Sequence, residues 1–243
     1  MGLRDWFSKE AKTNRSVERW GKRLGEKYLQ TQERKRAIDA LAEIGTEEAV
    51  VALLKRYQFR IDSTIADEDE KQHVYDVIVA LGRGAVPGIL AYIRTDPAVY
   101  WPLKALRTIV GDEETVTHLL ATMDSIEDTY GVNRDRMQQL VDNLREYAED
   151  PRVYQRLLVL VNDEDEDNVL RAIDGLAARK GDPSVPDTIV PLLLKPETSY
   201  RLRTLIMELM LEQEWNVKKF KKQLTGQIPE TYWIDDTGVV RRK

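Results

Sequence analysis

The stretch RAIDALA at residues 36–42 recurs almost letter for letter as RAIDGLA at residues 171–177. In both copies the apolar residues recur at the spacing of one helical turn, so each stretch predicts a helix with one apolar face. We expect Ala37 to permit close approach of a neighbouring helix, and Ile38 and Leu41 to fill the layer beneath it. The repetition predicts a chain built from one recurring helical unit.

Corners of similar composition follow the two copies and three further helical segments. From Gly45 to Gly181 there are four steps that average 34 residues. Glycine at such a corner ends a helix in the left-handed conformation, and an acidic residue or proline begins the next one. The five corners are Ile44-Gly45, Leu81-Gly82, Val110-Gly111, Ala148-Glu149 and Lys180-Gly181.

A second apolar set at helical spacing follows each corner, so each unit is predicted to be a pair of helices. One pair is too small to bury its apolar face, and neighbouring pairs must therefore stack. Residues 199–213 predict a sixth first helix, and residues 216–225 its partner. The sequence predicts an all-α, right-handed solenoid of five to six helical pairs. We divide it into a basic capping helix (1–30), the repeat array (31–225) and a C-terminal tail (226–243).

The segments RAIDALAEIGTEEAVVALL and NVLRAIDGLAARKGDPSVPDTIVPLLL resemble the HEAT repeats of bacterial HEAT-like proteins, including the phycobilisome-lyase type of repeat. The looser units between them extend the resemblance over residues 31–213. This resemblance implies an armadillo-like helical array. It is specific for architecture and implies no particular activity.

The two ends of the chain differ from its middle in charge. Residues 1–36 hold 11 Lys/Arg and 5 Asp/Glu, residues 37–214 hold 19 and 34, and residues 215–243 hold 7 and 3. The ends are therefore basic, and the repeat region has a net charge of −15. Such segregation bears on the choice of partner.

The N-terminal segment at residues 16–38 is interpreted as a helix that caps the array. An alternative is a basic arm that contacts a partner or an anionic membrane surface, with Trp6 and Phe7 as the inserting side chains. The C-terminal run around Tyr232 and Trp233, followed by a turn and Val239–Arg241, predicts a small β-hairpin. An isolated hairpin is marginally stable, so we expect it to pack on the last helices or, alternatively, on another protein.

The composition excludes several kinds of chemistry. The chain has no cysteine, which removes disulfides and thiolate sites and fits the cytoplasm as its compartment. We expect neither a signal sequence nor a membrane span. The two histidines, His73 and His118, fall in different units, and no HExxH, Walker or GxSxG motif is present. We therefore expect a protein that is not an enzyme and that holds no cofactor or metal.

The acidic string NDEDEDN at residues 162–168 invites comparison with a calcium loop. The sixth position of such a loop is Asn168 here instead of glycine, and the twelfth is Asp174 instead of glutamate. We expect the acidic residues to cap the following helix, where they satisfy free N–H groups and complement the helix dipole. The same interpretation is applied to the acidic run at residues 67–70. Both runs remain candidates for contact with a partner.

The expected function is protein binding, as a scaffold or adaptor, along a groove lined by the second helices of the pairs. The acidic surface would select a partner with a basic patch. Nucleic acid is not expected as a partner, because phosphate binding requires a basic stripe along the array. A lyase or isomerase acting on a bound pigment, and a nucleic-acid repair protein, are the alternatives that the family resemblance leaves open. The candidate partner-binding residues are Lys55, His118, Arg152, Arg156, Trp6, Phe7, Tyr232 and Trp233.

Overall fold

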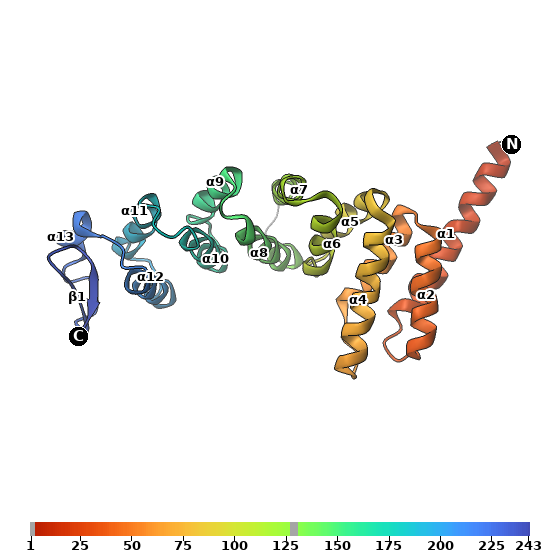
Figure 1. Cartoon of the computed structure of the whole chain (residues 1–243), viewed down its shortest axis with the longest axis horizontal. Coiled ribbons are helices and arrows are strands. Elements are labelled where there is room, and N and C mark those ends of the chain that lie inside the picture. The colour runs from red at the N-terminus through yellow and green to blue at the C-terminus, as the bar shows by residue number, and fades with distance from the viewer. Residues whose placement is uncertain (1–2, 127–130) are drawn as a thin grey trace. The chain divides into compact units, whose positions relative to one another are not determined.

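A computed structural model of the chain describes the backbone of residues 3–126 and 131–243, and the side chains from residue 10 onward within those ranges. The chain is all-α, with a small antiparallel hairpin at its C-terminal end (Figure 1). It divides into two compact units, Met1–Leu140 and Val141–Lys243, which we call unit 1 and unit 2. The predicted fold class is confirmed at this level.

Unit 1 begins with one long helix and continues as helical pairs. Short 3-10 turns follow two of the helices, η1 (Lys55–Gln58) and η2 (Gly82–Ala85). The helices are α1 (Leu3–Gly25), α2 (Thr31–Ile44), α3 (Glu47–Leu54), α4 (Thr64–Leu81), α5 (Val86–Ile93), α6 (Tyr100–Val110), α7 (Asp112–Asp124) and the first part of α8 (Val132–Leu144).

The pairs of unit 1 pack in a regular order. The first helix of one pair contacts the first helix of the next, α2 with α4 and α4 with α6. The second helices do the same, α3 with α5 and α5 with α7. The predicted α2 stripe is fully buried at Ala37, Ile38 and Leu41. Gly45 ends α2 with φ 62°, a left-handed conformation that glycine adopts without strain.

Unit 2 also consists of helical pairs, and the second helices of its last two pairs, α11 and α13, are short. It contains the end of α8, η3 (Arg145–Tyr147), α9 (Pro151–Leu160), α10 (Glu166–Ala177), α11 (Ser184–Ile189), η4 (Val190–Leu194), α12 (Tyr200–Glu212), η5 (Lys218–Phe220), α13 (Lys221–Leu224), β1 (Tyr232–Ile234) and β2 (Val240–Arg242). Helix α10 contacts α9, α11 and α12. Its RAIDGLA stripe is buried at Ala172, Ile173 and Leu176, as predicted.

The hairpin pairs Tyr232 with Arg242 and Ile234 with Val240. Strand β2 contacts α12, and the Val217 N–H donates to the Gly238 carbonyl at 2.8 Å, so the hairpin packs on its own unit. The Asp235 carboxylate closes the turn, because it accepts hydrogen bonds from the Thr237 hydroxyl and the Val239 N–H. These bonds hold the pKa of the Asp235 carboxyl well below its usual range.

Three details of the sequence interpretation are corrected. The segment at residues 16–38 is not one helix, because α1 ends at Gly25 and the chain turns before α2. The partner of α12 is only the 3-10 turn η5 and the four-residue α13. The acidic residues 67–70 do not precede a helix; they lie inside α4, whose N-cap is Ser63.

One stretch of the described chain, Thr64–Ile93, is long and apolar enough by length and composition to cross a membrane, which the sequence interpretation did not expect. In the structure this stretch is two helices, α4 and α5, separated by η2. Its apolar residues Val74, Ile78 and Ile89 are fully buried among the helices of unit 1. Helix α4 also buries the charged side chains of Asp67, Glu70 and Lys71.

Candidate functional site

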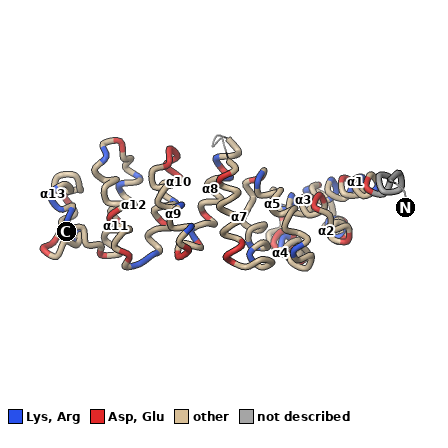
Figure 2. Tube along the Cα trace, turned by 90° about the horizontal axis from the view of Figure 1, so that it is seen from above, with Lys and Arg blue, Asp and Glu red and all other residues tan. Residues whose placement is uncertain are grey.

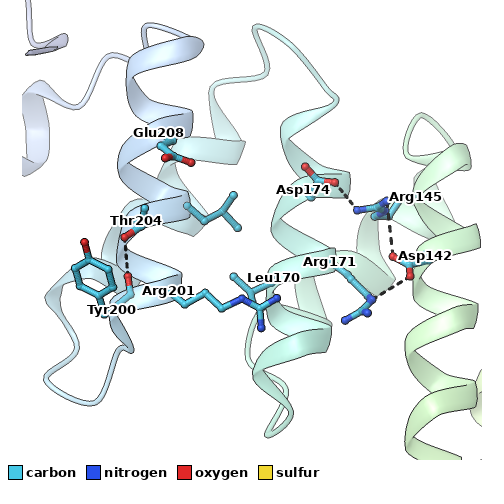
Figure 3. A pocket seen from close by; sticks show the side chains of 10 residues that line it. Asp142, Arg145, Leu170, Arg171, Asp174, Tyr200, Arg201, Thr204 and Glu208 are labelled. Carbon is cyan, nitrogen blue, oxygen red and sulfur yellow. Dashed lines mark hydrogen bonds and ion pairs between the residues drawn. The ribbon is translucent and has the colours of Figure 1, made fainter.

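A cleft of about 600 Å³ lies on the first helices of unit 2, between α10 and α12 and beside the end of α8 (Figure 3). Most of its lining side chains are charged or polar, and two are aliphatic. The lining residues are Asp142, Arg145, Leu170, Arg171, Asp174, Tyr200, Arg201, Thr204, Leu205 and Glu208. We expected a binding groove along the second helices, but this cleft lies on the first helices.

Ion pairs tie neighbouring first helices together along the cleft. The guanidinium of Arg171 on α10 lies 3.1 Å from the Asp142 carboxylate on α8. The Arg145 guanidinium, which follows α8, donates in turn to the Asp174 carboxylate on α10. Arg201 reaches from α12 towards α10 (Figure 3), where its guanidinium donates to the Asp167 carboxylate at 2.7 Å. Each arginine of the cleft therefore has a carboxylate partner.

Glu208 and Tyr200 have no such partner among the described residues. Both lie on α12, and Tyr200 is 86% exposed. The hydroxyl of Thr204, between them on the helix, donates to the Tyr200 carbonyl. Leu170 and Leu205 supply the apolar part of the lining. The cleft thus combines satisfied ion pairs with one free carboxylate and one free aromatic ring.

In unit 1, the first helices α4 and α6 carry aromatic side chains that group with Tyr57 of η1. Trp101, the second residue of α6, stacks on Tyr57 with ring centroids 5.7 Å apart and meets Tyr75 edge-on at 5.9 Å. The ammonium of Lys104 lies 4.7 Å from the centre of the Trp101 ring and 5.1 Å from that of Tyr75. Helix α6 therefore supplies its own cation to its aromatic surface.

Unit 1 also contains a buried ion cluster that the sequence interpretation missed. The Glu70 carboxylate accepts from Arg34 at 3.0 Å and from Arg56 at 2.5 Å, and Asp67 accepts from Arg56 at 2.7 Å. Lys71 lies 2.6 Å from Asp67, and all five side chains are at most 9% exposed. Burial favours a higher pKa for Asp67, but the hydrogen bonds from Arg56 and Lys71 outweigh it and lower the pKa to about 2. In the sequence, the i, i+4 spacing of Asp67 and Lys71 could have indicated an ion pair on one face of a helix.

The four candidate residues on second helices are divided between the units, and none of them lines the cleft. Lys55 is exposed at the start of η1, and His118 is half-buried on α7 with its Nε2 atom 3.6 Å from Glu114. Arg152 is exposed and donates to Asp150, the N-cap of α9. Arg156 is half-buried on α9.

The aromatic candidates lie at the two ends of the chain. Trp233 on β1 is 48% exposed, and Tyr232 is half-buried beneath the Arg242 guanidinium, 6.0 Å from its ring centre. The side chains of Trp6 and Phe7 are outside the described set.

The acidic residues before α10 act as helix caps, as predicted. Asp165 is the N-cap and accepts from the Asp167 N–H, while Asp163 accepts from the Asp165 N–H and the Asn168 amide. This acidic turn is visible as the red segment before α10 in Figure 2. The described side chains include no group of three or more His, Cys, Asp or Glu arranged to hold a metal ion.

Comparisons with protein families, with curated proteins and with solved structures find no match to this chain.

Proposed function

We propose that the chain is a HEAT-like helical solenoid that serves as a protein-binding scaffold. The contacts of first helices with first helices, and of second helices with second helices, support a stacked array within unit 1. The two buried RAID stripes support the same kind of layer in both units. Arrays of this kind present long surfaces on which a partner can lie.

The observation that carries the proposal is the cleft between α10 and α12. Its combination of an apolar lining, a ring that is 86% exposed and several charged groups is typical of a surface that recognises another protein. The net charge of −15 on residues 37–214 would draw a basic partner towards the array, chiefly by raising the association rate.

The test fills the cleft without changing its charge. The full chain is immobilised and exposed to lysate of its native cells, and the retained proteins are quantified by mass spectrometry. Leu205→Trp places a bulky side chain in the lining, whereas Leu211→Trp makes the same change on α12 outside it. Circular dichroism shows whether both variants keep their helices.

We expect the wild-type chain and Leu211→Trp to retain a common partner that Leu205→Trp loses, and raised salt to weaken its capture. The same proteins on all three baits would refute the cleft as the binding site. Co-purification of a pigment with a visible absorption band, and no captured protein, would refute the scaffold function.

A further inference from the structure

We propose that the cleft between α10 and α12 binds a short, extended basic segment of a partner protein, with one Lys or Arg side chain on the Glu208 carboxylate and a second over the Tyr200 ring. The inference rests on the proposed function and adds the chemistry of the partner. Three observations carry it: the pairing of charges in the cleft, the corresponding surface of unit 1, and the spacing on α12.

The pairing of charges favours an incoming cation over an anion. Arg171, Arg145 and Arg201 are held by Asp142, Asp174 and Asp167, respectively. Because each guanidinium already contacts a carboxylate, these arginines attract an incoming anion less strongly than unpaired arginines would. Glu208 holds the one lining carboxylate with no cation among the described residues, so a cation can bind it without breaking an existing contact.

The corresponding surface of unit 1 shows what the cleft lacks. Helices α6 and α12 both begin with an exposed tyrosine, Tyr100 and Tyr200. Four residues after Tyr100, Lys104 covers the rings of Trp101 and Tyr75 with its ammonium. Four residues after Tyr200 the chain has Thr204, whose hydroxyl is turned to the helix backbone. In unit 1 the ammonium over the Trp101 and Tyr75 rings comes from the same chain, whereas no cation of the described residues lies over the Tyr200 ring, which stays open to a cation from the partner.

The spacing on α12 sets the length of the partner segment. Glu208 follows Tyr200 by eight residues, which is about 12 Å along a helix that rises 1.5 Å per residue. An extended chain covers that distance in about four residues at about 3.3 Å each. The two basic side chains should therefore be three or four positions apart in the partner. Leu170 and Leu205 would contact the residues between them.

The probe is a random dodecapeptide display library selected on the immobilised full chain, with Leu205→Trp used to remove peptides that bind elsewhere. We expect the selected peptides to carry two Lys or Arg residues three or four positions apart. The dissociation constant of one selected peptide is then measured by fluorescence anisotropy at low salt.

A double-mutant cycle tests Glu208 directly. Glu208→Gln should weaken binding about five-fold, the upper range for an accessible ion pair. A peptide whose matching cation is changed to Gln should bind the wild-type chain and Glu208→Gln equally. The control, Glu212→Gln, removes an exposed carboxylate one turn further along α12 and should leave the dissociation constant unchanged.

The outcomes separate this inference from the proposed function. Selected peptides that lack cations, or that bind Glu208→Gln as well as the wild-type chain, refute the basic segment. If those peptides are still lost on Leu205→Trp, the cleft remains a protein-binding site and only the assigned chemistry is wrong. If no peptide depends on the cleft, both the chemistry and the site are wrong.

Discussion

The two units differ in how deeply they bury the charged side chains of their helical pairs. In unit 1, five charged side chains from α2, η1 and α4 form a buried cluster, and the aromatic rings of Tyr57 and Trp101 stack in the same unit, half-buried. In unit 2 the ion pairs stay near the surface and line an open cleft; Asp174, for example, is 55% exposed. In similar helical pairs, ionic contacts are thus buried between the helices of one unit and line an open cleft in the other.

The difference in burial predicts a large difference in energetic weight. Removing one member of a buried cluster leaves the others desolvated and without a partner, whereas surface pairs contribute little.

The largest effect is expected from Glu70→Leu in unit 1. The change leaves the buried guanidinium groups of Arg34 and Arg56 without their shared carboxylate, and should lower the free energy of unfolding by about 3–5 kcal/mol. Asp174→Ala, which removes the partner of Arg145 in unit 2, should cost less than about 1 kcal/mol. Urea denaturation followed by circular dichroism measures both. Equal losses would contradict the contrast between the units.

A smaller effect is expected where α3 and α5 approach most closely. A Cβ atom on Gly88 would lie 2.6 Å from the Val50 Cβ atom and 2.8 Å from the Glu47 carbonyl, and neither can move freely. Gly88→Ala should therefore destabilise the chain by about 2 kcal/mol, despite the better helix propensity of alanine. Thermal denaturation checks this.

Gly175→Ala is the matched change in unit 2. It converts RAIDGLA into the RAIDALA of α2, and its Cβ would meet Arg145 Cγ at 3.0 Å and Leu157 Cδ1 at 3.1 Å. These atoms belong to side chains that can shift, so the loss should be smaller than for Gly88→Ala. A larger loss at Gly175 would mean that the packing of Arg145 over α10 is rigid.

Acid should weaken unit 1 through Asp67. The folded-state pKa of about 2 is below the usual value of about 4, so its contribution is complete above pH 4 and is lost as the pH falls towards 2. Between pH 5 and pH 2.5 this group alone should remove about 1.5 kcal/mol. Asp67→Asn should lose correspondingly less over the same interval, as measured by urea denaturation at both pH values. Glu68→Gln, which alters an exposed neighbour, should keep the wild-type dependence.

The sequence predicted the parts of the fold that depend on local periodicity. The stripes through Ile38 and Ile173, the corner at Gly45 and the hairpin at Tyr232 each follow from residues within one or two turns of each other. Their burial or conformation in the structure agrees with the pattern.

The contacts that the sequence interpretation missed join residues far apart in the chain. Glu70 meets Arg34 across 36 positions and Arg56 across 14, so Asp67 and Glu70, two residues of the acidic run interpreted as a helix cap, are buried. The cleft likewise needs pairs such as Arg201 with Asp167, 34 positions apart. Helical spacing identifies which residues share a face, but not which face of the next helix they meet.

The smallest effect tests the comparison of α6 with α12. Thr204→Lys places on α12 the cation that Lys104 supplies on α6, four residues after the exposed tyrosine. The new ammonium would compete with a basic peptide for Tyr200 and Glu208, and should weaken binding of a cleft-selected peptide about five-fold, or about 1 kcal/mol. Thr204→Met, which is similar in length and uncharged, is the control and should keep most of the affinity. If both variants weaken binding equally, the effect of Lys at this position is steric, and the comparison of the two surfaces does not extend to their cations.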